Sequence, residues 1–383
     1  MINVFQPSLG EEELDAVRAV FESNWIGKGA KVDEFERTFA AHLGVDAANV
    51  MSVTSCTEAT FLAMELAGVG PGCEVVVPTV SFVSVANAVA AHGARPVFCD
   101  VDPRTLNPTA EHVEAALTSA TKAVVVLHYG GHPGDIERIA ALCRDRGLLL
   151  IEDAANAVAS TAGGRACGTF GDFGVWSFDH GKIAVAVDGG ILYARDPAHV
   201  ERGRKLAYFG LEAFSGFSQA ERSANRWWDI EVSEFGRRSI MNDVLAAVGC
   251  VQLRRLPDFL RRRGEIVARY DRELAGLPGL ALPPRLPEGH VGSHYFYWVQ
   301  MAADIRDDVA ADLYRRGIYT TLRYPLLHKV RAYGADVRLP GAERAAATTL
   351  CLPLHQGLSD ADVTAVVAAL TETVTARSAR EAS

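Results

Sequence analysis

Short apolar runs alternate with helical patterns between residues 50 and 153, and this alternation constrains the fold more than any other feature of the sequence. Five runs have the length and composition of buried strands: 50–53, 75–78, 96–99, 122–128 and 148–153. Helices are predicted in three of the segments between them: 58–67, 83–91 and 136–145. Strands that alternate with helices are typical of an α/β domain with a mostly parallel sheet. Because ligands of such sheets bind at the carboxyl ends of the strands, we expect the functional residues in the turns that follow them.

The rest of the chain predicts additional helices and a second, smaller domain. Residues 8–43 have the pattern of two helices around a glycine-rich turn, whereas residues 196–240 have no regular pattern. A long helical segment, 242–263, is expected to lead into the second domain. The segments predicted there are strands at 295–301 and 318–324 and helices at 307–316 and 360–376. We therefore predict a large sheet domain over residues 1–245 and a small α+β domain over residues 246–383.

Composition limits the partners and the compartment. The 383 residues carry a net charge of −9, which argues against a nucleic-acid partner because such a partner requires a basic surface. No apolar run approaches the length of a membrane span, and the first residues lack the pattern of a signal peptide. The 7 cysteines are scattered without a C-x-x-C pair, which favours reduced thiols over a metal site. We expect a cytoplasmic protein that has no metal and binds neither membranes nor nucleic acid.

A single lysine, Lys182, lies between two apolar runs, 173–178 and 191–194, directly after the turn residues 179–181. A lysine between buried strands is costly unless it is paired or used covalently. Burial is expected to lower its pKa, and a lysine of this kind attacks carbonyl carbons and forms Schiff bases. The alternative is an ordinary solvated lysine in a loop.

Three other residues could work together with Lys182. Asp153 ends a predicted strand, where a carboxylate can pair with a protonated heterocyclic nitrogen; a helix N-cap is the alternative for this residue. Thr57 lies at the start of a predicted helix, whose free amides and hydroxyl suit a phosphate, and Ser177 could add a further phosphate bond. A lysine, a carboxylate and a phosphate cradle are the parts that hold pyridoxal 5′-phosphate.

Several motifs occur in the order and spacing of a known family. They are Ser55-Cys56-Thr57, residues 77–83, residues 151–157, the spacing from Ser177 to Lys182, Asp188-Gly189-Gly190, residues 241–247, Tyr324-Pro325 followed by His328, and Leu352-Pro353-Leu354. Through this ordered set the sequence resembles the DegT/DnrJ/EryC1/StrS aminotransferases over nearly its whole length. The resemblance implies the fold of PLP-dependent transferases of fold type I and the amination of keto sugars.

The resemblance also implies residue roles. Lys182 would be the catalytic Schiff-base lysine, Asp153 the partner of the ring nitrogen, and Phe82 the side chain stacked on the ring. Phe82 could instead be a core aromatic, and His328 could be a satisfied core histidine. The full implied set is Cys56, Thr57, Phe82, Asp153, Asn156, Ser177, Lys182 and Arg238 for the cofactor, and Tyr324 and His328 for the substrate.

Two departures from the family pattern affect the site. Residues 186–190 differ from the usual segment after the lysine, and Ile240 stands where the family often has a polar residue that reaches the phosphate of the neighbouring subunit. Isoleucine cannot donate a hydrogen bond, so we expect Arg238, rather than Arg237, to supply this contact. The stretch 214–239, which is rich in Trp, Arg and Gly, is expected to form the interface of a homodimer with shared active sites.

The predicted reaction is the transfer of an amino group from glutamate to a keto sugar, linked to a nucleotide and aminated at C3 or C4. A keto-cyclitol acceptor is one alternative. A sugar dehydratase on the same fold is another, although relatives with that activity replace the lysine by histidine. A catalytically silent relative is the third, and the intact pair of Lys182 and Asp153 argues against it.

Overall fold

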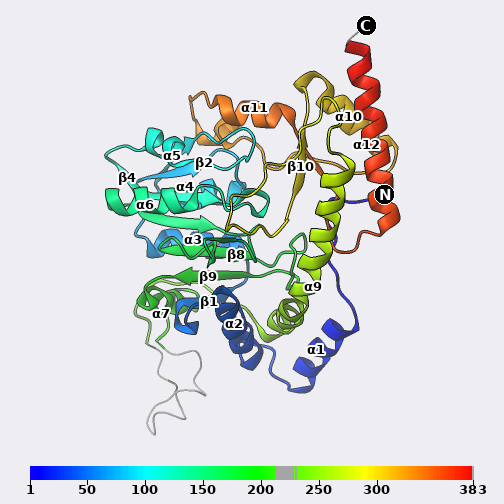
Figure 1. Cartoon of the computed structure of the whole chain (residues 1–383). Helices are drawn as coiled ribbons and strands as arrows, with labels where there is room; N and C mark the ends of the chain where they lie inside the picture. Colours follow the sequence, from blue (N-terminus) through cyan, green and yellow to red (C-terminus); the bar gives the residue numbers. More distant parts are fainter. Residues whose placement is uncertain (213–227, 229–230, 382–383) are drawn as a thin grey trace.

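The computed structural model describes residues 1–212, 228 and 231–381 (Figure 1). Its centre is a seven-stranded sheet in the order β1-β9-β8-β5-β4-β2-β3. The strands are β1 Val50–Val53, β2 Glu74–Pro78, β3 Arg95–Cys99, β4 Thr121–Leu127, β5 Leu149–Asp153, β8 Phe173–Ser177 and β9 Gly190–Ala194. In this sheet β9 runs in the direction opposite to the other six strands, so the predicted mostly parallel α/β sheet is confirmed.

Both faces of this sheet are buried. Along β2, Val75 and Val77 belong to one hydrophobic core while Val76 belongs to another on the opposite face, as the alternation of side chains along a strand requires. Parallel strands that are covered on both faces read as continuous apolar runs in the sequence. The covering helices are α3 Cys56–Leu66, α4 Val83–Ala91, α5 Ala110–Ala116, α6 Ile136–Arg146 and α7 Pro197–Leu206, and a small hairpin joins β6 Thr161–Ala162 to β7 Arg165–Ala166.

The two predicted N-terminal helices are present as α1 Glu11–Glu22 and α2 Ala30–Leu43. Phe35 and Phe39 of α2 are fully buried, and their rings meet the ring of Phe178 edge to face at 5.0 and 5.4 Å between centroids. Phe178 is the first residue after β8. The aromatic contacts therefore fix the point where the chain leaves the sheet toward Lys182.

The long helix α9, Asp243–Glu273, connects two cores. Phe259 packs in the core of the large sheet, whereas Ile266 and Tyr270 pack in a second core. The other elements of this second region are β10 Tyr297–Gln300, α10 Ala303–Arg315, α11 Pro340–Thr348, β11 Thr349–Leu352 and α12 Asp360–Glu381. The bridging role predicted for this helix agrees with the structure, while the boundary between residues 245 and 246 stays a prediction.

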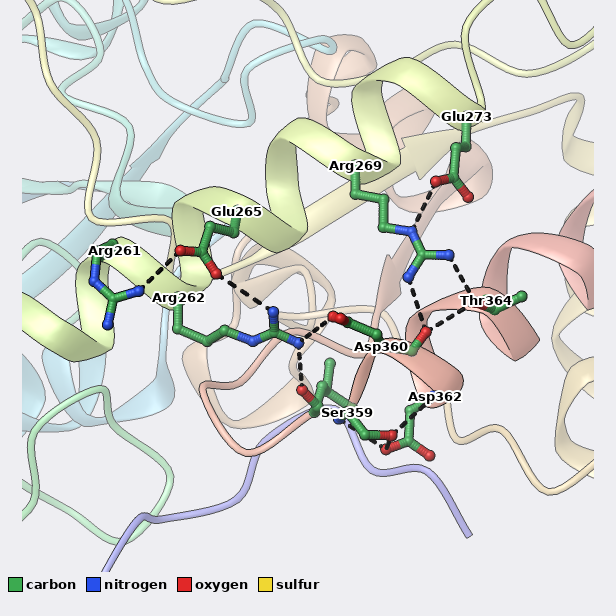
Figure 2. Close-up of polar contacts among 10 residues, drawn as sticks. Arg261, Arg262, Glu265, Arg269, Glu273, Ser359, Asp360, Asp362 and Thr364 are labelled. Carbon is green, nitrogen blue, oxygen red and sulfur yellow. Dashed lines mark hydrogen bonds and ion pairs between the residues drawn. The ribbon is translucent and has the colours of Figure 1, made fainter.

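Figure 2 shows how the start of α12 is held against α9. Arg262 donates to the carboxylate of Asp360 at 2.8 Å, and Arg269 donates to the backbone oxygen of the same residue at 2.8 Å. At the beginning of α12, the hydroxyl of Ser359 donates to the carboxylate of Asp362 at 2.6 Å, and the amide of Asp362 donates back to that hydroxyl at 3.1 Å. This reciprocal pair is a capping arrangement, which satisfies amides that the first turn leaves free.

One predicted strand is wrong. Residues 318–324 form isolated bridges only, from Ile318 to Ile2 and from Thr321 to Cys351. Because this segment runs between the N-terminal segment and β11 without a continuous partner, its last residues leave the bridges and enter the cavity described below. Among the helices of the described residues, none combines the length and apolar character needed to cross a membrane.

Candidate active site

A cavity of about 490 Å³ lies at the carboxyl ends of β2, β4, β5 and β8. The second region of the chain contributes Tyr295, Arg323 and Tyr324 to its wall. Seven of the residues predicted from the sequence line this cavity: Cys56, Thr57, Phe82, Asp153, Ser177, Lys182 and Tyr324. The structure therefore brings together, from distant parts of the chain, most of the predicted site.

Lys182 follows the turn that begins at Asp179, where its amide donates to the backbone oxygen of that residue at 2.9 Å. Its Nζ donates to Oδ1 of Asn156 at 3.4 Å and lies 4.8 Å from the ring centroid of Tyr295. The hydroxyl of Tyr295 in turn donates to the oxygen of Gly181 at 3.2 Å. The structure thus places the amine of Lys182 in the wall of the cavity. Lys182 is therefore not an ordinary solvated loop lysine.

The charge state of Lys182 differs from the sequence expectation. Burial lowers its pKa, but the acidic groups around it, Tyr295, Tyr324, Cys56 and Asp153, raise the pKa above the ordinary lysine value overall. The predicted lowering of this pKa is therefore wrong for the chain by itself. At neutral pH the amine carries a proton, which it must release before it attacks a carbonyl carbon.

Asp153 ends β5 and is only 4% exposed. Its Oδ1 accepts from the amide of Ala155 at 3.0 Å, but turns rather than a helix follow, so the alternative of a helix N-cap is wrong. Burial raises the pKa of Asp153, opposed by the Ala155 amide and by the charges of Lys182 and His128. A buried carboxylate of this kind is stabilised by a cation, and a protonated ring nitrogen supplies one.

The predicted phosphate cradle corresponds to the start of α3, which lies beside β9. Ser55 caps α3 by accepting from the amide of Glu58 at 3.1 Å, and the first-turn residues Cys56 and Thr57 face the cavity. Amides in a first turn have no acceptor within their own helix and attract anions. A Cβ atom on Gly190 would come within 2.4 Å of the Ser55 backbone, so only glycine lets β9 approach this turn. Burial also raises the pKa of the Cys56 thiol, which stays protonated.

Asn156 and Phe82 complete the fit to pyridoxal phosphate. The Nδ2 of Asn156 is buried and has no partner in the described part of the chain, while its Oδ1 accepts from the hydroxyl of Tyr324 at 3.3 Å. An orphaned donor next to Lys182 fits an acceptor oxygen on the cofactor ring. Phe82 is 46% exposed and meets Tyr324 at 5.8 Å between ring centroids, so the alternative of a core aromatic is wrong. Amide donors, a carboxylate, an orphaned amide and a lysine thus match the groups of this cofactor.

Three predicted residues are not part of the cavity lining: Asn156, which bonds to Lys182 as described above, and His328 and Arg238, which lie elsewhere. His328 is buried, with its Nδ1 2.7 Å from the hydroxyl of Thr79 and its Nε2 3.4 Å from Glu343, as expected of a satisfied core histidine. Arg238 is exposed and its guanidinium lies 5.6 Å from the ring centroid of Tyr208.

The alternative Arg237 is engaged elsewhere, because it donates to Glu58 at 2.7 Å and to Glu65 at 3.0 Å on α3. Neither arginine reaches the phosphate cradle of its own chain. Most of the stretch 214–239, including Trp227, lies outside the described residues.

Sequence reasoning missed several residues that line the cavity: Phe5, Ser84, His180, Asp188, Tyr295 and Arg323. Asp188 belongs to the segment 186–190, which departs from the family pattern. The sequence therefore drew attention to this segment without assigning a role to Asp188. Phe5, Tyr295 and Arg323 come from the N-terminal segment and the second region, where no strand end signals a site. The neighbouring Tyr324 was the one indication that this part of the chain reaches the cavity.

Comparison with known proteins identifies the fold and the chemistry. A family model described as the DegT/DnrJ/EryC1/StrS aminotransferase family matches residues 7–371. The chain belongs to this family. The mostly parallel sheet with its covering helices is thus the fold of an aminotransferase of this family.

Individual relatives of this aminotransferase cover almost all of the chain. A dTDP-4-dehydro-2,3,6-trideoxy-D-glucose 4-aminotransferase from Saccharopolyspora spinosa is 59% identical over 366 residues, which are 96% of this chain and 95% of that protein. The crystal structure of the aminotransferase TlmJ from Streptoalloteichus hindustanus has 60% identity and a TM-score of 0.94, covering 99% of this chain and 100% of its own. The sugar aminotransferase CalS13 from Micromonospora echinospora has 29% identity and a TM-score of 0.88, covering 97% and 100%.

Proposed function

We propose that this aminotransferase uses pyridoxal phosphate to move an amino group from glutamate to C4 of a nucleotide-linked 4-keto deoxysugar. The observation that carries the proposal is the 59% identity, over almost the whole chain, to an enzyme named for that type of acceptor. The cavity supports it, because Lys182, Asp153 and the first turn of α3 line one space.

In this proposal each side chain has a separate task. Pyridoxal phosphate, when bound, supplies an electron sink for the carbon that carries the amino group. The α3 amides, Thr57 and Ser177 anchor its phosphate, and Asp153 keeps a proton on its ring nitrogen. Lys182 holds the cofactor between turnovers and moves protons at the reacting carbon during them. Asn156 and Phe82 fix the orientation of the ring.

The remaining alternatives gain no support from the cavity. A dehydratase of this fold would have histidine at position 182, and a silent relative would not need Lys182 and Asp153 in the same wall. A keto-cyclitol acceptor differs from the proposed one in lacking a nucleotide, and a direct assay separates the two.

The function is tested by offering the purified enzyme glutamate together with a panel of acceptors. The panel contains nucleotide-linked 4-keto and 3-keto deoxysugars and a keto-cyclitol, and release of 2-oxoglutarate is the readout. The proposal expects the highest kcat/KM with a 4-keto sugar nucleotide. Preference for the 3-keto sugar or for the cyclitol contradicts it.

We also propose that the enzyme is a cytoplasmic homodimer. All seven cysteines are free, which suits a reducing compartment. Large apolar side chains remain exposed near β1 and α7: Phe209 at 45%, Val232 at 55% and Phe235 at 100%. Burying exposed apolar side chains of this kind is favourable, and a second subunit can bury them.

A further inference from the structure

Arg323 places a guanidinium group in the wall of the cavity. It lines the same space as Lys182, and its guanidinium carbon lies 4.6 Å from the ring centroid of Phe5. Within the described residues, no hydrogen bond or ion pair of its side chain is found. Stacking on an aromatic face holds the guanidinium plane and leaves the N–H groups at its edge free for a ligand.

The carboxylates that line the cavity are engaged with other groups. Asp153 accepts from the amide of Ala155, Asp179 lies 2.7 Å from the Nδ1 of His180, and Asp188 accepts from the amide of Gly189 at 2.8 Å. Within the described residues, none of these three carboxylates forms an ion pair with Arg323. A partly desolvated cation with free donors is complemented by an anionic ligand.

Two sets of contacts link Arg323 to the surroundings of Lys182. A Cβ atom on Gly181 would lie 3.7 Å from Phe5, so the ring that stacks on Arg323 packs against the residue before Lys182. On the other side, Tyr324 follows Arg323 directly and bonds to Asn156, which also accepts from Lys182. An anion bound by Arg323 would therefore share one cavity with the amine of Lys182.

We propose that Arg323 binds the α-carboxylate of the amino donor and so selects an amino acid for the first half of the reaction. The assignment rests on the proposed function, since it assumes an amino-acid donor. A carboxylate on the same carbon as the reacting amine matches the forked geometry of guanidinium, and Arg323 lines the same cavity as Lys182. The diphosphate of a sugar nucleotide offers a similar pair of anionic oxygens, and the experiment distinguishes these two sources.

The test compares the holoenzyme with its Arg323→Gln and Arg323→Lys variants. Arg331→Gln is the matched control, because Arg331 is exposed in a nearby turn outside the cavity wall. Binding of glutarate, an unreactive dicarboxylate, is measured by calorimetry, and the glutamate half-reaction is followed by absorbance without any sugar. Arg323→Gln is expected to weaken glutarate binding and to slow the glutamate half-reaction, each by about 10- to 100-fold. The KM for the keto sugar nucleotide is expected to stay at the wild-type value.

The other outcomes separate the two proposals. A raised KM for the sugar nucleotide with unchanged glutarate binding overturns the carboxylate assignment in favour of the diphosphate. Unchanged behaviour of the folded Arg323→Gln variant in every assay overturns the assignment alone. If Arg323→Gln fails to fold, Arg323→Lys decides: it keeps the charge but loses the fork, so wild-type glutarate affinity in this variant also overturns the assignment. A wild-type enzyme that releases no 2-oxoglutarate from glutamate overturns the proposed function itself and, with it, this inference.

Discussion

Lys182 and Asp153 are two residues of one cavity whose environments shift their pKa values in the same direction. Both pKa values lie above their ordinary values, for Asp153 because burial disfavours its charge and for Lys182 because acidic groups surround it. The amine is therefore protonated in the chain alone, and the carboxylate is ready to accept a cation. The proposed cofactor, which has an electrophilic carbon and a protonated ring nitrogen, would change the pKa values of both residues.

Replacing Lys182 by alanine is expected to remove covalent cofactor binding and to lower turnover by at least about 100-fold, since no other lysine side chain lines the described cavity. The measurement is the visible absorption band of the purified holoenzyme, combined with the release of 2-oxoglutarate. Lys122→Ala is the control, because Lys122 is an exposed residue of β4; this variant should keep the absorption band and the release of 2-oxoglutarate. Turnover of Lys182→Ala near the wild-type rate would show that another group performs the proton transfer.

Replacing Asp153 by asparagine is expected to keep the fold and to lower turnover by several orders of magnitude. Asparagine has the same shape but cannot hold the ring nitrogen in its protonated state by charge, so the reacting carbon loses its electron sink. Thermal unfolding monitors the fold and single-turnover kinetics monitor the reaction. Asp145→Asn, an exposed residue of α6, serves as the control. Wild-type kinetics in Asp153→Asn would reduce Asp153 to a turn residue that bonds Ala155.

At the scale of elements, a buried arginine joins α9 to the segments that form the cavity wall. Arg263 is 2% exposed and donates to the backbone oxygens of His294, Tyr295 and Leu354, each at 2.9 Å. Burial lowers the pKa of Arg263 to about 10, so it remains charged at neutral pH. Because Tyr295 packs against Lys182, this helix supports the site without contacting it.

Arg263→Met is expected to lower the free energy of unfolding by at least about 3 kcal/mol, since three buried carbonyl groups lose their donor. Urea unfolding provides the measurement. Arg261→Met on the same helix is the matched control; its exposed ion pairs with Glu265 and Asp258, the first of them drawn in Figure 2, should contribute less than about 1 kcal/mol. Equal losses in the two variants would mean that the buried donors of Arg263 are not what stabilises this junction.

At the scale of the whole molecule, exposed apolar side chains predict a dimer. Phe235→Glu is expected to shift the protein from dimer to monomer at micromolar concentration and to reduce activity, because a buried charge at an interface is unfavourable. Sedimentation of the holoenzyme measures the change. Tyr314→Glu is the control, since Tyr314 is exposed on α10, which Figure 1 shows at the opposite end of the molecule from α7. A wild-type monomer with full activity contradicts the prediction.

Arg238 tests whether the active sites are shared across that dimer. Its side chain is exposed and does not line the cavity of its own chain, so a role at the cofactor requires the partner subunit. Arg238→Ala is expected to increase the loss of cofactor during dialysis while the protein remains dimeric. Retention equal to that of the wild type would remove Arg238 from the site and leave the dimer prediction standing.

The sequence by itself determined the sheet and identified two residues, Lys182 and Asp153, that line one cavity in the structure. The apolar runs of β2, β4 and β5 predict parallel strands because strands covered on both faces contain little else than apolar residues. Asp153 was identifiable because it ends such a run, and Lys182 because it follows another run after the turn residues 179–181; strand ends converge at one edge of the sheet.

Tertiary structure decided the rest of the cavity wall and the charges within it. Phe5, Tyr295 and Arg323 lie far apart in the chain and carry no local pattern that points to a site; packing of the second region brings them together. The same packing placed His328 beside Thr79 rather than in the cavity, and it raised the pKa of Lys182 instead of lowering it. Local pattern fixes which face a residue of a strand presents, but a pKa or a pocket depends on neighbours that only the folded chain supplies.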